Sequence, residues 1–348
     1  ALVWTTKAAL DWTQGYLERK GDENPRLSAQ WLLCHATGLS RLELYTCFDR
    51  LLTLDELSCL RDAIKRRGVG EPLQYISGVA PFRHLELKVS PGVLIPRPET
   101  ETLVQLVLDW LKVRSTAAGS TLEHTDSCEH TRILDIATGS GCVALSLALE
   151  VFGAQVVATD ISSDAVALAT ENARLQGLDT AALAVIQDDL AGSLIADCSA
   201  HASFDVVVSN PPYIPSGELE LLPREVYDYE PVLALDGGAD GLDVYRRLIG
   251  QAATLLRPRG LFACELHETN LDQAALIIGQ ASCVKRSTSQ SQMPYRSQCF
   301  DQVTIHKDLA GRLRFITAVR SGCACDVGVE ILTGETSCEH GVLLRTER

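Results

Sequence analysis

The stretch that decides the fold is RILDIATGSGCVALSLALE, residues 132–150. Residues 133–135, ILD, read as a short strand, and residues 142–150 read as a helix. Between the two, residues 135–141 read DIATGSG. Glycines at such a turn let the backbone approach a ligand closely and leave the first N–H groups of the helix free. The stretch therefore predicts a strand, a ligand-binding loop and a helix in succession.

Strand-like and helix-like segments alternate downstream of this stretch. A helix is expected from Ser162 or Ser163, either of which can cap it, to Leu175, and a second helix over residues 244–256. Short apolar segments predict further strands at 156–159, 184–186, 206–208 and 261–265. This alternation predicts an α/β fold, with a mostly parallel sheet covered by helices on both faces.

An acidic residue ends the second strand: Asp160, about nineteen residues after Gly141. A carboxylate there can accept hydrogen bonds from both hydroxyls of a ribose. Glycine turns alone are common, but together with this acid they favour a nucleoside-type cofactor. Asp188 and Asp189 follow the third strand, where an adenine edge can be met, although a solvated turn is the preferred reading of Asp188. The predicted cofactor-binding residues are Asp135, Ala137, Thr138, Gly139, Ser140, Gly141, Asp160, Asp189, Leu190 and Asn210.

The fourth strand ends in Asn210-Pro211-Pro212-Tyr213. A residue before proline is pushed to extended geometry, and two prolines prevent a helix and donate no N–H. The side-chain oxygen of Asn210 and a backbone carbonyl can then accept both hydrogens of one planar –NH2 group, on which Tyr213 can stack. These four residues are the predicted catalytic residues. The plain alternative is a strand-terminating Asn-Pro turn.

Composition and charge limit the classes of function. The 348 residues include 31 basic and 45 acidic ones, a net charge of −14, which argues against binding that neutralises many phosphates. No apolar run reaches membrane-spanning length, and we expect no export signal. Twelve scattered cysteines favour reduced thiols. Two C-terminal pairs, Cys323 with Cys325 and Cys338 with His340, are spaced by one residue, too closely for an ordinary zinc site, so no metal is predicted.

Residues 1 to about 76 are expected to be helical. The sequence from Thr53 to Glu56 has the pattern of a capping box ahead of apolar residues at helical spacing, and Gly68 and Gly70 are expected to end that helix.

The next segments predict a hairpin and another helix. Apolar and polar residues alternate over residues 82–89, and Ser90-Pro-Gly92 is expected to supply the turn of the hairpin. An amphipathic helix is expected from Thr100 to about Val113. The small and polar residues 115–131 are expected to form a surface loop.

These motifs carry a resemblance. Residues 132–265 resemble Rossmann-like S-adenosylmethionine-dependent methyltransferases, among which Asn-Pro-Pro-Tyr is shared by enzymes that methylate adenine, guanine or glutamine nitrogens. Upstream, EPLQYISGVAPFRHLELKVSPGVLIPRPETE (71–101) closely resembles the HemK/PrmC family of bacterial methyltransferases, which modify the glutamine of the Gly-Gly-Gln motif in class I peptide chain release factors. EPVLALDGGADGLDVYRRLI (230–249) and KDLAGRLRFITA (307–318) match as well.

The resemblance implies a cofactor, a partner and a division into domains. It implies S-adenosyl-L-methionine as cofactor, a release factor as protein substrate, and a cytoplasmic enzyme of translation termination that binds neither membrane nor nucleic acid directly. The implied parts are a helical substrate-recognition domain (1–76), a β-hairpin linker (77–96), a methyltransferase domain (97–320) and a tail of unknown role (321–348).

Some residues depart from the family pattern or stay open. The family usually has glycine where Ala137 stands, and alanine is costly there if the backbone needs a positive φ. Arg97 and Glu99 are expected either to border the cofactor pocket or to form a structural ion pair. Two other classes stay open: a methyltransferase acting on nucleic-acid amino groups, and a protein of this fold that binds partners without catalysis.

Overall fold

The computed structural model describes residues 4–117, 130–284, 296–322, 329–330 and 345–346. The chain divides into two compact units. One unit comprises Ala1–Ala80, Val89–Ile95 and Leu222–Glu230; the other comprises Pro81–Lys88, Pro96–Leu221 and Pro231–Arg348.

The first unit is helical, as the sequence predicts. Thr53 caps one of its helices in a capping box: Glu56 N–H donates to Thr53 Oγ1 (3.2 Å), and Thr53 N–H donates to Glu56 Oε2 (2.8 Å). That helix ends at Arg67, just before the expected glycines. Leucines from several of the helices form one buried cluster. The helices are α1 (Thr6–Arg19), α2 (Pro25–Thr37), α3 (Glu43–Thr46), α4 (Leu54–Arg67), α5 (Leu73–Ser77) and α10 (Arg224–Tyr227).

The predicted hairpin exists, but its turn lies elsewhere. Strands β1 (Val79–Phe82) and β2 (Leu85–Lys88) form a two-stranded sheet. The turn is at Arg83, with φ 51°, and not at Ser90-Pro-Gly92, which follows the hairpin. Arginine is not a typical turn residue, so the sequence does not indicate this turn. Tertiary contacts hold it instead: the Arg83 N–H donates to Glu101 Oε1 (3.0 Å) and the guanidinium donates to Glu150 Oε1 (2.6 Å).

The second unit is built on a central sheet. Within the described residues this sheet has eight strands in the order β13-β10-β11-β7-β6-β3-β4-β5. The strands from β7 to β5 are parallel, as predicted, whereas β11 runs antiparallel to both β7 and β10. The bounds are β3 (Arg132–Ile136), β4 (Gln155–Asp160), β5 (Leu183–Gln187), β6 (Phe204–Ser209), β7 (Leu256–Glu265), β10 (Phe300–Lys307), β11 (Leu313–Arg320) and β13 (Arg345–Thr346).

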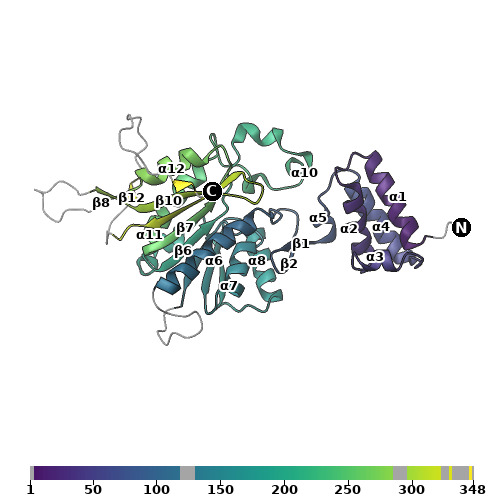
Figure 1. Ribbon diagram of the computed structural model, residues 1–348, viewed down its shortest axis with the longest axis horizontal. Coiled ribbons are helices and arrows are strands. Elements are labelled where there is room, and N and C mark those ends of the chain that lie inside the picture. Colours follow the sequence, from purple (N-terminus) through teal and green to yellow (C-terminus); the bar gives the residue numbers. More distant parts are fainter. Residues whose placement is uncertain (1–3, 118–129, 285–295, 323–328, 331–344, 347–348) are drawn as a thin grey trace, which may run out of the picture. The chain divides into compact units, whose positions relative to one another are not determined.

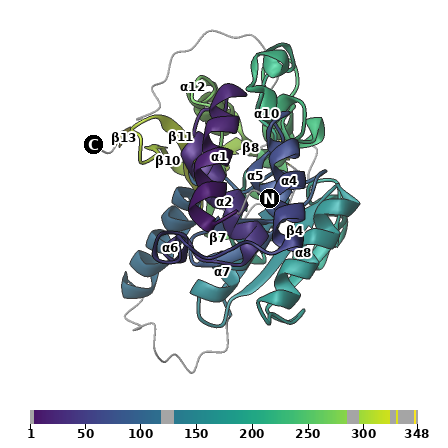
Figure 2. The same ribbon diagram turned by 90° about the vertical axis from the view of Figure 1, so that its right-hand side faces the viewer.

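Helices cover both faces of this sheet (Figures 1 and 2). Successive strand residues point to opposite faces, so Ile133 joins a cluster with residues of α6, α7 and α8, while Leu134 joins one with residues of α11 and α12. Both clusters are fully apolar, which explains why the central strands read as continuous hydrophobic runs. The helices are α6 (Thr100–Ala117), α7 (Cys142–Glu150), α8 (Ser163–Leu175), α9 (Gly192–Ala196), α11 (Asp243–Leu255) and α12 (Leu271–Gln280).

The structure extends or limits several expectations. Helix α6 runs to Ala117, past the expected end near Val113. A small sheet of β12 (Val329–Glu330), β8 (Ser282–Val284) and β9 (Arg296–Gln298) was not foreseen. The cysteine and histidine pairs of the tail lie outside the described residues. In the described part of the chain, no group of three metal-ligand side chains comes together, and no helix is long and apolar enough to cross a membrane.

Candidate functional site

The strand order places a topological switch point in the second unit. The chain leaves β3 toward β4 and β5 but leaves β6 toward β7, so the connections diverge between β3 and β6. Ligands of open α/β sheets bind at such a switch point, beyond the carboxyl ends of the strands. Register aligns those ends: Ile136 pairs with both Thr159 and Ser209, and Ser209 pairs with Cys264. The residues that follow are Ala137, Asp160, Asn210 and Glu265.

The glycine loop, residues 137–141, leaves β3 in left-handed backbone. Ala137, Gly139 and Gly141 have φ of 60°, 56° and 84°. Asp135 shapes this loop from inside, since Thr138 Oγ1 (2.6 Å) and the N–H of Ala144 (3.1 Å) both donate to its Oδ2. Burial raises the pKa of Asp135 to about 7. The side chains of Thr138 and Ser140 are also buried, so the loop presents its backbone.

Asp160 ties the glycine loop to the end of β4. Its Oδ2 accepts the N–H of Gly139 (2.8 Å), and its Oδ1 accepts the N–H of Ser162 (2.9 Å). Burial raises the pKa of Asp160. A carboxylate has about four acceptor sites, so Asp160 can still accept from a ligand hydroxyl. An outward backbone cradle beside such an acid fits a nucleoside-type cofactor.

The three residues that follow Gln187, the last residue of β5, make three different kinds of contact. Asp188 accepts the N–H (2.9 Å) and hydroxyl (2.7 Å) of Ser193, which is the turn preferred from the sequence. Asp189 forms an exposed ion pair with Arg247 (2.7 Å). Leu190 has φ 56° and packs its side chain into the apolar core, so only its backbone is free to line a cofactor site.

The Asn-Pro-Pro-Tyr segment, residues 210–213, follows β6. Asn210 Nδ2 donates to Thr100 Oγ1 (3.1 Å). Among the described residues no donor reaches Asn210 Oδ1 or the carbonyl of Pro211. The Tyr213 hydroxyl donates to Glu265 Oε1 (3.3 Å), and burial raises the pKa of Tyr213, which keeps the phenol neutral. The segment thus leaves two acceptors beside a neutral aromatic ring.

Two site residues were not found from the sequence. Thr100 and Glu265 are both buried, and Thr100 Oγ1 donates to Glu265 Oε2 (2.7 Å). Burial raises the pKa of Glu265 to about 7. Each gave a weak signal: Thr100 lies in the PETE sequence of the resembling segment, and Glu265 is a carboxylate at the end of a buried strand. Glu99 Oε1 lies 3.8 Å from Arg312 Nη2, so Glu99 forms an ion pair with a residue of the loop before β11.

A glycine-containing loop supports Tyr213 from behind. Ile214 N–H donates to the carbonyl of Leu235 (2.9 Å), and Gly237 N–H donates to the carbonyl of Ile214 (2.8 Å). A Cβ added to Gly237 would lie 2.7 Å from both Tyr213 Cα and the carbonyl oxygen of Gly241. Only glycine therefore fits this close approach, which explains the glycine at position 237.

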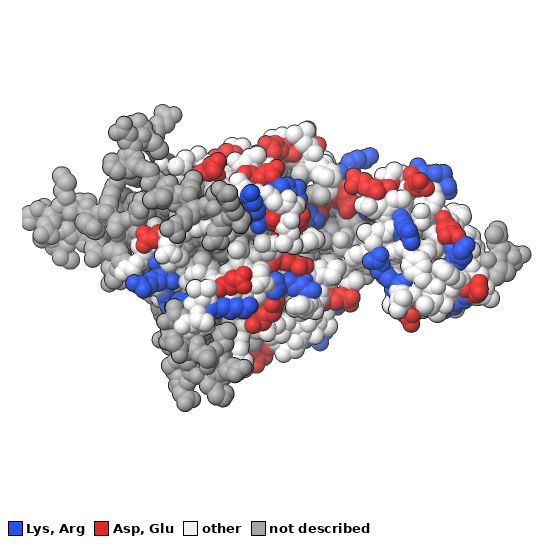
Figure 3. Space-filling model, in the orientation of Figure 1, with Lys and Arg blue, Asp and Glu red and all other residues white. Residues whose placement is uncertain are grey.

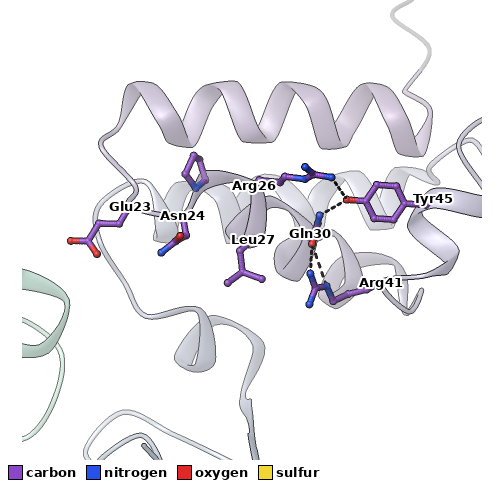
Figure 4. A pocket seen from close by; sticks show the side chains of 8 residues that line it. Glu23, Asn24, Arg26, Leu27, Gln30, Arg41 and Tyr45 are labelled. Atoms are coloured by element: carbon purple, nitrogen blue, oxygen red, sulfur yellow. Dashed lines mark hydrogen bonds between the residues drawn. The ribbon is translucent and has the colours of Figure 1, made fainter. Parts of the chain in front are cut away.

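The helical unit contains an open pocket of about 490 Å³, shown in Figure 4. Its polar groups pair with one another: Arg41 Nη2 donates to Gln30 Oε1 (2.9 Å), and Arg26 Nη2 and Gln30 Nε2 both donate to the Tyr45 hydroxyl. Leu27 is partly exposed in the same wall. Elsewhere, acidic and basic side chains are interspersed on the face drawn in Figure 3.

The mainly parallel sheet, the glycine loop with Asp160 and the Asn-Pro-Pro-Tyr segment define the second unit as a Rossmann-like methyltransferase domain. Models of two families match the chain: the PrmC N-terminal domain over residues 8–78 and a methyltransferase domain over residues 127–315. The chain is 42% identical over 280 residues to a release factor glutamine methyltransferase of Geobacter sulfurreducens, covering 80% of this chain and 89% of the relative. A protein of the same name from Chlorobaculum tepidum is 41% identical over 279 residues, 80% of this chain and 91% of the relative. The chain belongs to the release factor glutamine methyltransferase family.

Proposed function

We propose that the protein uses S-adenosyl-L-methionine to methylate the side-chain amide nitrogen of the glutamine in the Gly-Gly-Gln motif of class I peptide chain release factors. The observation that carries the proposal is the hydrogen bond from Asn210 Nδ2 to Thr100. This bond turns the Asn210 oxygen away from Thr100, so that it can accept from an incoming amide. Family membership supports the choice of glutamine over a nucleobase.

The proposed cofactor contacts follow from the local geometry. The backbone of the glycine loop and the carboxylate of Asp160 would hold the nucleoside, with Asp160 directed to the ribose. Asp189 and the backbone of Leu190 would lie toward the adenine. When bound, S-adenosylmethionine supplies an electrophilic sulfonium methyl group.

The chain's own task is to position a poor nucleophile. An amide nitrogen reacts slowly because its lone pair is delocalised into the carbonyl. Asn210 Oδ1 and the Pro211 carbonyl would accept its two N–H groups and fix the nitrogen, while Pro212 holds the backbone extended and neutral Tyr213 covers the flat face. Positioning of this kind contributes roughly 7–11 kcal/mol in favourable cases.

The helical unit is the proposed grip on the protein substrate. A glutamine side chain offers few contacts, whereas stable protein interfaces bury about 1,200–2,000 Å². The pocket lined by Leu27, Arg41 and Tyr45 supports a role in binding a folded partner. Because the proposed substrate is a translation factor, the proposed location is the cytoplasm.

The decisive experiment offers purified release factor, DNA and RNA to the full-length protein with labelled S-adenosylmethionine. We expect label on release factor only, at the glutamine of Gly-Gly-Gln by mass spectrometry. Transfer to nucleic acid, or to another residue, would refute the proposal.

The role of the helical unit is tested by Leu27→Asp. This substitution should lower methylation of intact release factor and leave cofactor binding unchanged. Leu54→Asp, at a leucine that is 82% exposed and lies outside the pocket, is the matched control.

A further inference from the structure

We infer that Glu265 is a positioning residue. Its carboxylate orients Asn210 by way of Thr100, and it orients Tyr213 by a direct hydrogen bond. The inference rests on the proposed function of the Asn-Pro-Pro-Tyr segment and names what sets its geometry. Glu265 ends β7, and the register of Ser209 with Cys264 brings it level with Asn210.

The direction of each hydrogen bond follows from chemistry. An ionised carboxyl only accepts, so when Glu265 is ionised the single proton of Thr100 Oγ1 goes to Glu265 Oε2, 2.7 Å away. The hydroxyl of Thr100 can then only accept from Asn210. Only the –NH2 half of the Asn210 amide can donate, at 3.1 Å, so the other half, Oδ1, points away from Thr100. The carboxylate thereby excludes the flipped amide, which would present donors to the substrate –NH2.

The second oxygen of the same carboxylate holds the aromatic ring. Tyr213 donates to Glu265 Oε1 (3.3 Å), so one buried group fixes both an acceptor and the ring that flanks it. Thr100 is 1% exposed and Glu265 is 0% exposed, so water does not compete for these bonds. Thr100 is the first residue of α6, whose apolar face is buried against the sheet. This packing fixes the position of Thr100 between Glu265 and Asn210.

A purely structural ion pair is a poorer explanation for a buried carboxylate at position 265. Among the described residues, the cation nearest to Glu265 Oε1 is Arg314 Nη1, at 3.9 Å, and Arg314 Nε also lies 3.6 Å from Asp308 Oδ2. Burying a carboxylate without a close counter-ion is costly, and an apolar side chain of the same size would be tolerated better if packing were its only role. The arrangement is explained by the two hydrogen bonds that it accepts.

The test compares Thr100→Val with Thr100→Ser in the full-length protein. Valine keeps the shape of the side chain and removes the hydroxyl, whereas serine keeps the hydroxyl. We expect Thr100→Val to lower kcat for release factor by about ten- to a hundredfold, the cost of a misplaced group, with the Kd for S-adenosylmethionine within about twofold of wild type. Thr100→Ser should restore kcat to within about threefold. Equal kcat for the two variants would overturn the inference while leaving the proposed function intact.

A second readout needs no turnover. In protein labelled with ¹⁵N-asparagine, the side-chain signal of Asn210 is identified by its loss in Asn210→Asp. We expect its –NH2 protons to shift and exchange faster in Thr100→Val, and to match wild type in Thr100→Ser. An unchanged Asn210 signal in Thr100→Val would overturn the inference that Glu265 orients Asn210 by way of Thr100. If wild type fails to methylate release factor, the proposed function falls, and these spectra still decide whether Thr100 orients Asn210.

Discussion

The glycine loop and the Asn-Pro-Pro-Tyr segment leave neighbouring strands at the same edge of the sheet, but they are held in different ways. The loop is held by nearby residues: Asp135 accepts from Thr138, and Asp160, at the end of the adjacent strand, accepts from Gly139. The segment is held by side chains remote in sequence. Thr100 precedes Asn210 by 110 positions, and Glu265 follows Tyr213 by 52.

The difference is consistent with the two tasks proposed for these regions. A loop that presents its backbone to a ligand needs only a permissive backbone and a nearby acid, so a short motif suffices to encode it. An amide clamp needs one orientation of one side chain, which a short motif cannot enforce because either half of an amide can face outward. Substitutions in the loop should therefore affect cofactor affinity or stability, whereas those in the segment and its support should affect turnover.

The largest expected effect is on turnover in Asn210→Ala. Removing one of two acceptors should lower kcat by about 10²–10³-fold, as for other lost catalytic hydrogen bonds. The Kd for S-adenosylmethionine by calorimetry should stay near wild type. Asp160→Ala is the converse control, with weaker binding as its main effect. A kcat near wild type for Asn210→Ala would contradict the division between the two regions.

Next is the pH dependence of stability caused by Glu265. Its folded-state pKa of about 7 lies above the ordinary value of 4.5, so its favourable contribution is present below about pH 4.5 and is lost as the pH rises toward 7. The loss approaches roughly 3 kcal/mol, since one pKa unit corresponds to about 1.4 kcal/mol. Urea unfolding of wild type and Glu265→Gln from pH 5 to 8 measures it.

The stability of Glu265→Gln relative to wild type should rise with pH and level off above about 7. Asp135, whose pKa burial also raises to about 7, is common to both proteins and cancels from the difference. A difference that does not change with pH would show that Glu265 titrates as an ordinary carboxyl.

Gly237→Ala tests the support behind Tyr213. Its Cβ would overlap Tyr213 Cα, so we expect a loss of about 2 kcal/mol in the free energy of unfolding, the usual cost of overpacking, together with lower turnover. Gly217→Ala is matched, because a Cβ there meets nothing within 4 Å, and it should change stability by less than about 0.5 kcal/mol. Equal effects of the two substitutions would disprove the close contact.

The smallest expected effect is a gain in stability for Ala137→Gly. The left-handed backbone at Ala137 costs alanine about 1–2 kcal/mol of stability. Glycine removes this strain, but it also makes the unfolded chain more flexible, which offsets part of the gain. We expect the free energy of unfolding to rise by about 0.5–1 kcal/mol. Ala167→Gly, on the exposed face of α8, should lower it by about 1 kcal/mol. A loss of stability in Ala137→Gly would show that the methyl group is needed for packing.

The positions of Thr53 and Ser162 illustrate what was predictable from local sequence. Each caps a helix through a backbone N–H three residues ahead, and both helices begin where the sequence predicts. The parallel strands could also be predicted, because burial on both faces makes them continuous apolar runs. The turn at Arg83 could not, since its left-handed backbone is held by Glu101 and Glu150 rather than by a turn residue.

The sequence by itself determined the α/β alternation, the glycine loop with Asp160, and the Asn-Pro-Pro-Tyr segment, because each depends on neighbouring residues or on a repeated pattern of burial. Only the tertiary structure decided that Thr100 and Glu265, 165 positions apart, meet behind Asn210. It also decided that antiparallel β11 pairs with β7 and brings Arg314 near Tyr213. Such contacts depend on strand order and register, and both are set by packing across the whole sheet rather than by any short stretch of chain.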